Sequence, residues 1–389
     1  MTLVCAQVAS FGVGAVAHAA AYTVWRKRSE DAKMSKEWPF FGLFTQLAFL
    51  GCVAGAFAYG ARIGNLSLIY SSRKLELLRD ATVFELQKMN LQRSGENRWA
   101  AAFYLLYPFE LSLVVAAQLL VVHRMQRLSS MMQQPVWVRL RRLFIAAIVL
   151  FNVIGIVGNI AAAVYFIQAA DAADKAANAW ATNSSATATG LQFQSGKRKT
   201  TAAAAAAVQR FSEMIMLLLI SAAFLVVGVS CSRVISSALR TLSSAEQKVS
   251  HLVGSAGARS RQLIHDAGTE GRSLQRKIVA TFVFVFFTVA LRCVFSVMFA
   301  VALAFQDIDK SCAPSICDAC YNIYSHITFW ILYIPLFQQF VMLIASPLSL
   351  IVALWGMSNI RALEDVRAVQ APMQSAAVAP DHNCSIMDA

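Results

Sequence analysis

Two ionisable residues lie deep inside long apolar stretches, where a charge needs a partner. Glu110 lies within residues 99–122 and Arg292 within residues 278–305. Counted from the ends that we place outside the membrane, both lie about 17–20 Å deep at a helical rise of roughly 1.5 Å per residue. A charged side chain at that depth is costly and is by default a candidate functional site. We therefore predict a buried pair between Glu110 and Arg292 near the midplane of a membrane.

Amide side chains fall at similar depths in two further apolar stretches. Asn159 lies in residues 143–169, and Gln338 and Gln339 lie in residues 326–354. With the predicted pair they would form a polar layer across a helical bundle. Such a layer can hold helices together, form a ligand pocket, switch between two helix packings, or line the pathway of a transporter. The sequence leaves these interpretations open.

The composition indicates which elements position this layer. Of 389 residues, 58% are hydrophobic and 14% charged, whereas soluble domains have about 45–50% and about 25%. These values exclude an ordinary soluble enzyme and a disordered chain. Seven stretches approach or exceed the roughly 20 apolar residues that cross a bilayer. They are residues 3–25, 40–60, 99–122, 143–169, 211–232, 278–305 and 326–354. We predict an all-α polytopic membrane protein, a seven-transmembrane-helix bundle over residues 1–369 with a flexible cytosolic tail at 370–389.

The positions of the basic residues predict the orientation. No Lys or Arg precedes the first stretch, whereas residues 26–28 directly after it are Arg-Lys-Arg. The segments that this places inside carry more Lys and Arg than those outside, as the positive-inside rule requires. The topology is thus GPCR-like, with the N-terminus out and the C-terminus in; a signal peptide cleaved after residues 17–19 is the alternative. The net charge of +13 is then explained by topology, and we expect no nucleic-acid partner.

Three cysteines lie close together in the last predicted outer loop, at Cys312, Cys317 and Cys320. If this loop faces an oxidising compartment, two of them form a disulfide and the third can pair with Cys5. A zinc site, with a fourth ligand from Asp318 or His326, is the alternative. We expect no bound metal or cofactor.

The longest loops connect the second to the third, the fourth to the fifth and the fifth to the sixth stretch. The first, residues 61–98, has a helix-like pattern and contains the sequon at Asn65; extended helices are expected, or an amphipathic surface helix. The second, residues 170–210, contains the sequon at Asn183, and we expect helical ends around a disordered middle. Both asparagines are candidate glycosylation sites. The third, residues 233–277, is basic and cytosolic, and could bind a signalling protein or anionic lipid, or simply be solvated.

Two segments resemble the tobamovirus-multiplication-protein family of plants, seven-span proteins often grouped with receptor-like folds. The first is Leu105-Leu106-Tyr107-Pro108, followed by Leu119-Leu120-Val121 and Arg124; the second is Arg276-Lys277-Ile278, followed by Leu291-Arg292-Cys293-Val294. The resemblance implies a multi-pass protein of internal or vacuolar membranes that recruits partners at its cytosolic face. It also implies a structural or switching role for Arg292.

Several sequence features of other protein classes are missing. The seventh stretch has no lysine for a retinal Schiff base, and the third ends in His123-Arg124-Met125, not in the acidic-Arg-aromatic triplet of rhodopsin-like receptors. No catalytic motif has credible spacing, so we expect no enzyme. We predict a receptor-like or scaffold membrane protein, in the plasma membrane or an endomembrane, that signals or recruits a cytosolic protein through 233–277. A transporter or channel that uses the polar layer is the alternative.

Overall fold

The computed structural model describes residues 2–31, 38–76, 82–128, 135–182, 184–249, 255–305, 341–342 and 344–357. Within these ranges the chain is helical and contains no strand, which confirms the all-α prediction. The elements are α1 (Thr2–Asp31), α2 (Trp38–Glu76), α3 (Val83–Leu128), α4 (Pro135–Ala181), α5 (Ser185–Val249), α6 (Ser255–Phe305), the π-helix η4 (Ile344–Leu348) and α9 (Ser349–Met357).

Local sequence determines several of the helix ends. Thr82 and Glu85 form a reciprocal capping box at the start of α3, because the Thr82 amide donates to the Glu85 carboxylate at 2.7 Å and the Glu85 amide donates to Thr82 Oγ1 at 3.3 Å. Pro135 is the first residue of α4, where its missing N–H costs nothing. Pro108 lies inside α3 and Pro347 inside η4, so both interrupt the regular hydrogen-bond ladder.

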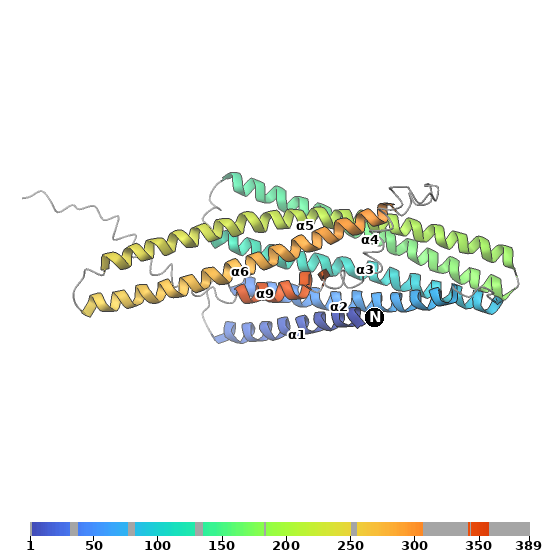
Figure 1. Ribbon diagram of the computed structural model, residues 1–389, viewed down its shortest axis with the longest axis horizontal. Coiled ribbons are helices and arrows are strands. Elements are labelled where there is room, and N and C mark those ends of the chain that lie inside the picture. The colour runs from blue at the N-terminus through green and yellow to red at the C-terminus, as the bar shows by residue number, and fades with distance from the viewer. Residues whose placement is uncertain are drawn as a thin grey trace, which may run out of the picture.

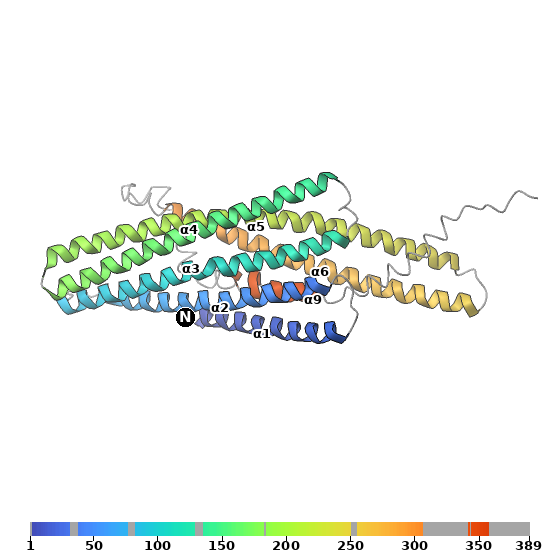
Figure 2. The same cartoon turned by 180° about the vertical axis from the view of Figure 1, so that it is seen from behind.

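The helices pack side by side in chain order, as the two opposite views show (Figure 1, Figure 2). α9 packs mainly against α6 and also reaches α1, α2 and α3, so the last element lies between the two ends of the row. Residues from all of α1–α6 and from α9 contribute to one hydrophobic core. Polar residues inside the bundle are therefore enclosed on several sides.

The outer surface of the bundle is apolar. Val16, Phe57, Phe109 and Phe287 are each at least 60% exposed, whereas Glu110, next to Phe109, is fully buried. Among the described residues, six helices are long and apolar enough to cross a membrane, and α9 belongs to a shorter apolar segment, Ile344–Ala353. The protein is an integral, multi-pass membrane protein. Most of the predicted seventh span lies outside the described residues.

Most of the helices are longer than a bilayer requires. α5 has 65 residues, which is roughly 100 Å of helix against a hydrocarbon core of about 30 Å. At one end of the molecule α2, α3, α4 and α5 continue together as a four-helix extension, made of residues 61–76, 83–98, 170–182 and 184–205 (Figure 1). The prediction of extended helices at 61–98 is confirmed. The prediction of a disordered middle at 170–210 is wrong, because α4 continues to Ala181 and α5 begins at Ser185.

Small side chains explain why α4 and α5 remain helical in this extension. Their facing surfaces bury a series of alanines, which lets two backbones approach closely and gives good intrinsic helix propensity: Ala169, Ala170, Ala173, Ala176, Ala177, Ala188, Ala202 and Ala206. Ion pairs link this hairpin to its neighbours, since Arg98 on α3 contacts Asp174 at 2.6 Å and Lys199 on α5 contacts Glu96. Tertiary packing thus orders a segment whose polar composition suggested a loop.

At the opposite end, α5 and α6 project beyond the other helices as a long hairpin (Figure 2). The described residues of the predicted basic loop, 233–249 and 255–277, are helical. Gln275 donates to Ser236 at 2.9 Å and joins the two helices of this α5–α6 hairpin. The described residues of the basic segment are therefore continuations of two membrane helices.

Candidate functional site

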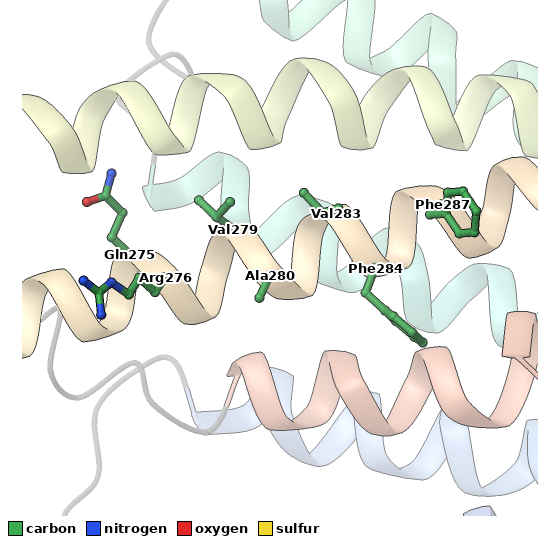
Figure 3. A pocket seen from close by; sticks show the side chains of 7 residues that line it. All are labelled: Gln275, Arg276, Val279, Ala280, Val283, Phe284 and Phe287. Carbon is green, nitrogen blue, oxygen red and sulfur yellow. The ribbon is translucent and has the colours of Figure 1, made fainter.

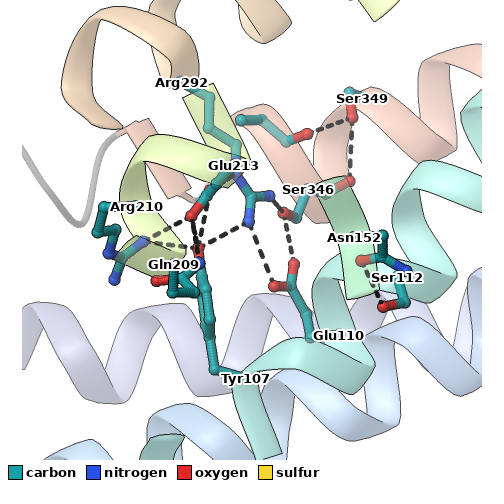
Figure 4. Close-up of polar contacts among 11 residues, drawn as sticks. Tyr107, Glu110, Ser112, Asn152, Gln209, Arg210, Glu213, Arg292, Ser346 and Ser349 are labelled. Atoms are coloured by element: carbon teal, nitrogen blue, oxygen red, sulfur yellow. Dashed lines mark hydrogen bonds and ion pairs between the residues drawn. The ribbon is translucent and has the colours of Figure 1, made fainter. Parts of the chain in front are cut away.

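A buried network of charged side chains joins α3, α5, α6 and η4 (Figure 4). Arg292 on α6 is at its centre. Its Nε donates to Glu213 on α5 at 3.1 Å, and its Nη2 contacts Glu110 on α3 at 3.4 Å. Its Nη1 donates to the Ser346 hydroxyl in η4 at 2.6 Å. One guanidinium thus binds three other elements.

Two further residues belong to this network, Tyr107 on α3 and Arg210 on α5. The Tyr107 hydroxyl donates to Glu213 and accepts from both Arg210, at 2.8 Å, and Arg292, at 3.1 Å. Arg210 also donates to Glu213 at 2.9 Å, three residues along the same helix. Its guanidinium lies 4.7 Å from the centre of the Tyr107 ring and 4.9 Å from that of Phe299, which is cation–π geometry. The donors around Glu213 therefore hold its carboxylate in one orientation.

Ser346 is positioned by an unusual backbone. Its hydroxyl accepts from Arg292 and donates to Glu110 at 2.7 Å, so it bridges the two partners of the predicted pair. The residue lies in the five-residue π-helix η4, directly before Pro347. Single π-turns occur frequently at functional sites, because the wider turn changes the direction of its side chains. The irregular turn brings Ser346 to the network.

The network is buried and electrically balanced. Glu110, Arg210, Glu213 and Arg292 are each at most 2% exposed. Two arginines and two glutamates sum to zero charge, so these four described residues carry no net charge together. A buried charge without a partner is strongly destabilising, and this pairing avoids that penalty. The network can rigidify one packing of four elements, and removing any one charge would leave another uncompensated.

A small cavity adjoins the network on the α4 side. It has a volume of about 10 Å³ and is lined by Pro108, Asn152, Asn159, Gln209, Glu213 and apolar neighbours. Asn152 accepts from Ser112 at 3.0 Å and joins α3 to α4. Asn159 is 1% exposed, and neither its side-chain nitrogen nor its oxygen has a partner. A space of this size admits no ligand much larger than water.

The structure describes some of the predicted site residues and not others. Glu110 and Arg292 lie together, and Asn159 lies in the adjoining cavity, beside Glu213 and not in direct contact with the pair. Gln338, Gln339, the cysteines 312, 317 and 320, and Asn183 lie outside the described residues. Cys5 is a free, exposed thiol.

The candidate glycosylation site at Asn65 does not suit the folded chain. Its side chain is 2% exposed, and its Nδ2 donates to the Glu96 carbonyl at 2.8 Å while its Oδ1 accepts from Arg62 at 2.7 Å. A glycan on this nitrogen would break the contact between α2 and α3. Asn65 is a packing residue of the four-helix extension in this structure, and a glycan there stays a prediction.

Arg210, Glu213, Tyr107 and Ser346 were not predicted as site residues. The apolar stretch counted from residue 211 placed Glu213 at the membrane edge, whereas α5 places it level with Glu110 and Arg292. The spacing Arg210-x-x-Glu213 was a usable indication, since residues three apart on a helix can form an ion pair. Ser346 gave no such indication, because a single serine before a proline is common in a membrane helix.

A second, larger hollow lies on the surface of α6 (Figure 3). It has a volume of about 710 Å³ and follows one face of the helix, with Val279, Val283 and Phe287 toward one end and Gln275 and Arg276 at the other. Phe284 points toward α9 in the close-up. Its apolar lining suits lipid chains and provides no group for catalysis.

No family model, curated protein or solved structure matches this chain. In the part of the chain that the structure describes, no three His, Cys, Asp or Glu side chains gather as metal ligands would. The geometry of the charge network therefore carries the argument for function.

Proposed function

We propose that this chain is a receptor-like membrane protein in which the charge network controls the packing of the α5–α6 hairpin. The observation that carries the proposal is that Arg292 binds Glu110, Glu213 and Ser346 on three other elements. Packed helices have discrete arrangements, so a change in one such contact shifts whole elements. Loss of the contacts at Arg292 would let α6 move relative to α3.

The hairpin carries this movement away from the membrane. α5 and α6 run without interruption from the network to Val249 and from Ser255, respectively. Between residues 233 and 277 the chain has eight basic and three acidic residues. We place this end in the cytosol, where it would present a basic surface to an acidic signalling or scaffold protein. The N-out orientation agrees with the positive-inside rule.

The resemblance to the tobamovirus-multiplication-protein family supports the same proposal. It would place the protein in an internal or vacuolar membrane, with the plasma membrane as the other location. We propose no enzymatic activity and no cofactor.

Hydrogen–deuterium exchange of the full chain in nanodiscs tests the proposed switch. The variant Glu110→Gln/Arg292→Gln removes one charge of each sign, so the bundle stays neutral and the Arg210–Glu213 pair remains. We expect faster exchange in peptides of 233–277, with unchanged exchange in the four-helix extension. Thr288→Ala is the matched control, because Thr288 is equally buried on α6 and bonds only the Val285 carbonyl. Unchanged exchange at the hairpin, or a uniform increase across all helices, would contradict a switch.

Thiol accessibility separates this function from a transporter. The cavity beside Asn159 has a volume of about 10 Å³, which favours a closed network over a pathway. An Asn159→Cys variant should resist impermeant thiol reagents applied to either side of sealed vesicles. Labelling from both sides would instead support alternating access and a transporter.

A further inference from the structure

Two buried polar side chains around the cavity between α3, α4 and α5 have unused hydrogen-bonding capacity. Asn159 on α4 lacks partners for both side-chain atoms, and Gln209 on α5 lacks one for its Oε1. Pro108 on α3 has no N–H, so the carbonyl of Tyr104 loses its regular helical donor. All three helices supply residues to the lining of this cavity. No bulk water reaches such groups in the hydrocarbon region of a bilayer.

The volume and charge of the site restrict what it can hold. About 10 Å³ is close to the least space that one water molecule requires. An ion is disfavoured, because Glu213 in the wall is already neutralised by Arg210 and Arg292. A cation would be repelled by the two arginines, and an anion by the carboxylate. The site suits one small, neutral group that both donates and accepts hydrogen bonds.

We propose that this cavity is a binding site for a single structural water molecule that joins α4 to the charge network. The water accepts a hydrogen bond from Asn159 Nδ2 and donates one to Gln209 Oε1. Gln209 in turn donates to Glu213 at 2.9 Å, so the chain of hydrogen bonds runs from α4 to the centre of the network. The water thereby links the network to a helix that provides none of its charges.

Radiolytic footprinting of the full chain tests the site, because a bound water generates hydroxyl radicals where it lies. Met216 lines the cavity and is 1% exposed, and Met342 is equally buried but does not line it. Short X-ray pulses followed by mass spectrometry should oxidise Met216 several-fold more than Met342. Equal oxidation of the two methionines would overturn the proposal.

Two variants make the test specific to the cavity. Asn159→Leu keeps a similar volume and removes both polar atoms, so oxidation of Met216 should fall to the level of Met342. Gly155→Ala leaves polarity unchanged and places a methyl group in the wall, where it meets Ser212 Cβ at 3.7 Å and Gln209 Cγ at 3.9 Å, both ordinary contacts. This variant should therefore lower the oxidation of Met216 in the same way, because the added methyl group fits without a steric clash. Undiminished oxidation in a folded Gly155→Ala or Asn159→Leu protein would contradict the assignment. This result is independent of whether the α5–α6 hairpin moves.

Discussion

Arg292 and Glu110 should be strongly coupled in a double-mutant cycle. Coulomb's law with an effective dielectric constant of about 20 gives roughly 5 kcal/mol for the Arg292–Glu110 contact at 3.4 Å and a similar value for Arg292–Glu213 at 3.1 Å. Either single change to glutamine leaves one buried charge uncompensated. Each single variant should therefore lose about 3–5 kcal/mol of stability.

The double variant should be much less damaged than the sum of the two singles. Removing both charges restores neutrality and leaves the Arg210–Glu213 pair intact, so we expect a coupling energy of roughly 2–3 kcal/mol. The assay is equilibrium unfolding of the full chain in mixed dodecylmaltoside and dodecylsulfate micelles, followed by far-UV circular dichroism. The two single variants can be compared through the midpoints of their unfolding curves. The double-mutant cycle therefore does not require that either variant be as stable as the unmodified protein.

A second cycle provides the control. Glu110→Gln combined with Thr288→Ala pairs the same carboxylate with a buried α6 residue that bonds only within its own helix. These changes should be additive within about 0.5 kcal/mol. A coupling between Glu110 and Arg292 no larger than this control would refute the interpretation of the network as a set of interdependent charges.

Four further substitutions test the hydrogen-bond network, helix packing and a helix end. Tyr107→Phe removes a hydroxyl that accepts from two arginines and donates to Glu213, and should cost about 1.5–3 kcal/mol in the same unfolding assay. Gly158→Ala brings a methyl carbon to 3.2 Å from the backbone of α5 and should cost about 1–3 kcal/mol; Gly190→Ala, with nothing within 4 Å, should stabilise the helix by about 0.5–1 kcal/mol. Thr82→Ala removes the capping box with Glu85, and hydrogen exchange should show fraying confined to the first turns of α3, at a cost of about 1 kcal/mol.

The sequence predicts the membrane helices because their apolar stretches are long and nearly free of charge. It also predicts the helical continuation at 61–98, where leucines and charges alternate with helical spacing. The helical ends of 170–210 were predicted, but its helical middle was not, because Ser, Thr, Asn and Ala have little hydrophobicity to form a pattern. Isolated helices of such composition are marginal. They are ordered here by alanine packing between two long helices, which no local feature of 170–210 reveals.

The charge network was only half predictable for a related reason. Hydropathy counts each charge as a penalty, so the apolar stretch of α5 was started after Arg210 and Glu213 was placed at its edge. In the folded chain the two residues neutralise each other at 2.9 Å and lie at the centre of the bundle. A charged residue therefore does not mark the end of a membrane-spanning segment when a residue of opposite charge lies three positions away on the same helix.

The same pairing divides the network into two functional parts. The Arg210–Glu213 pair on α5 is neutral by itself, whereas α3 supplies Glu110 and α6 supplies Arg292. Separating α3 from α6 would break the Glu110–Arg292 contact, its bridge through Ser346 and the hydrogen bond from Arg292 to Tyr107. That contact, at 3.4 Å, is the longest ion pair of the network within the described residues. A ligand or partner that shifts α6 relative to α3 would act on this contact, while Arg210, Tyr107 and Glu213 keep the rest of the network together.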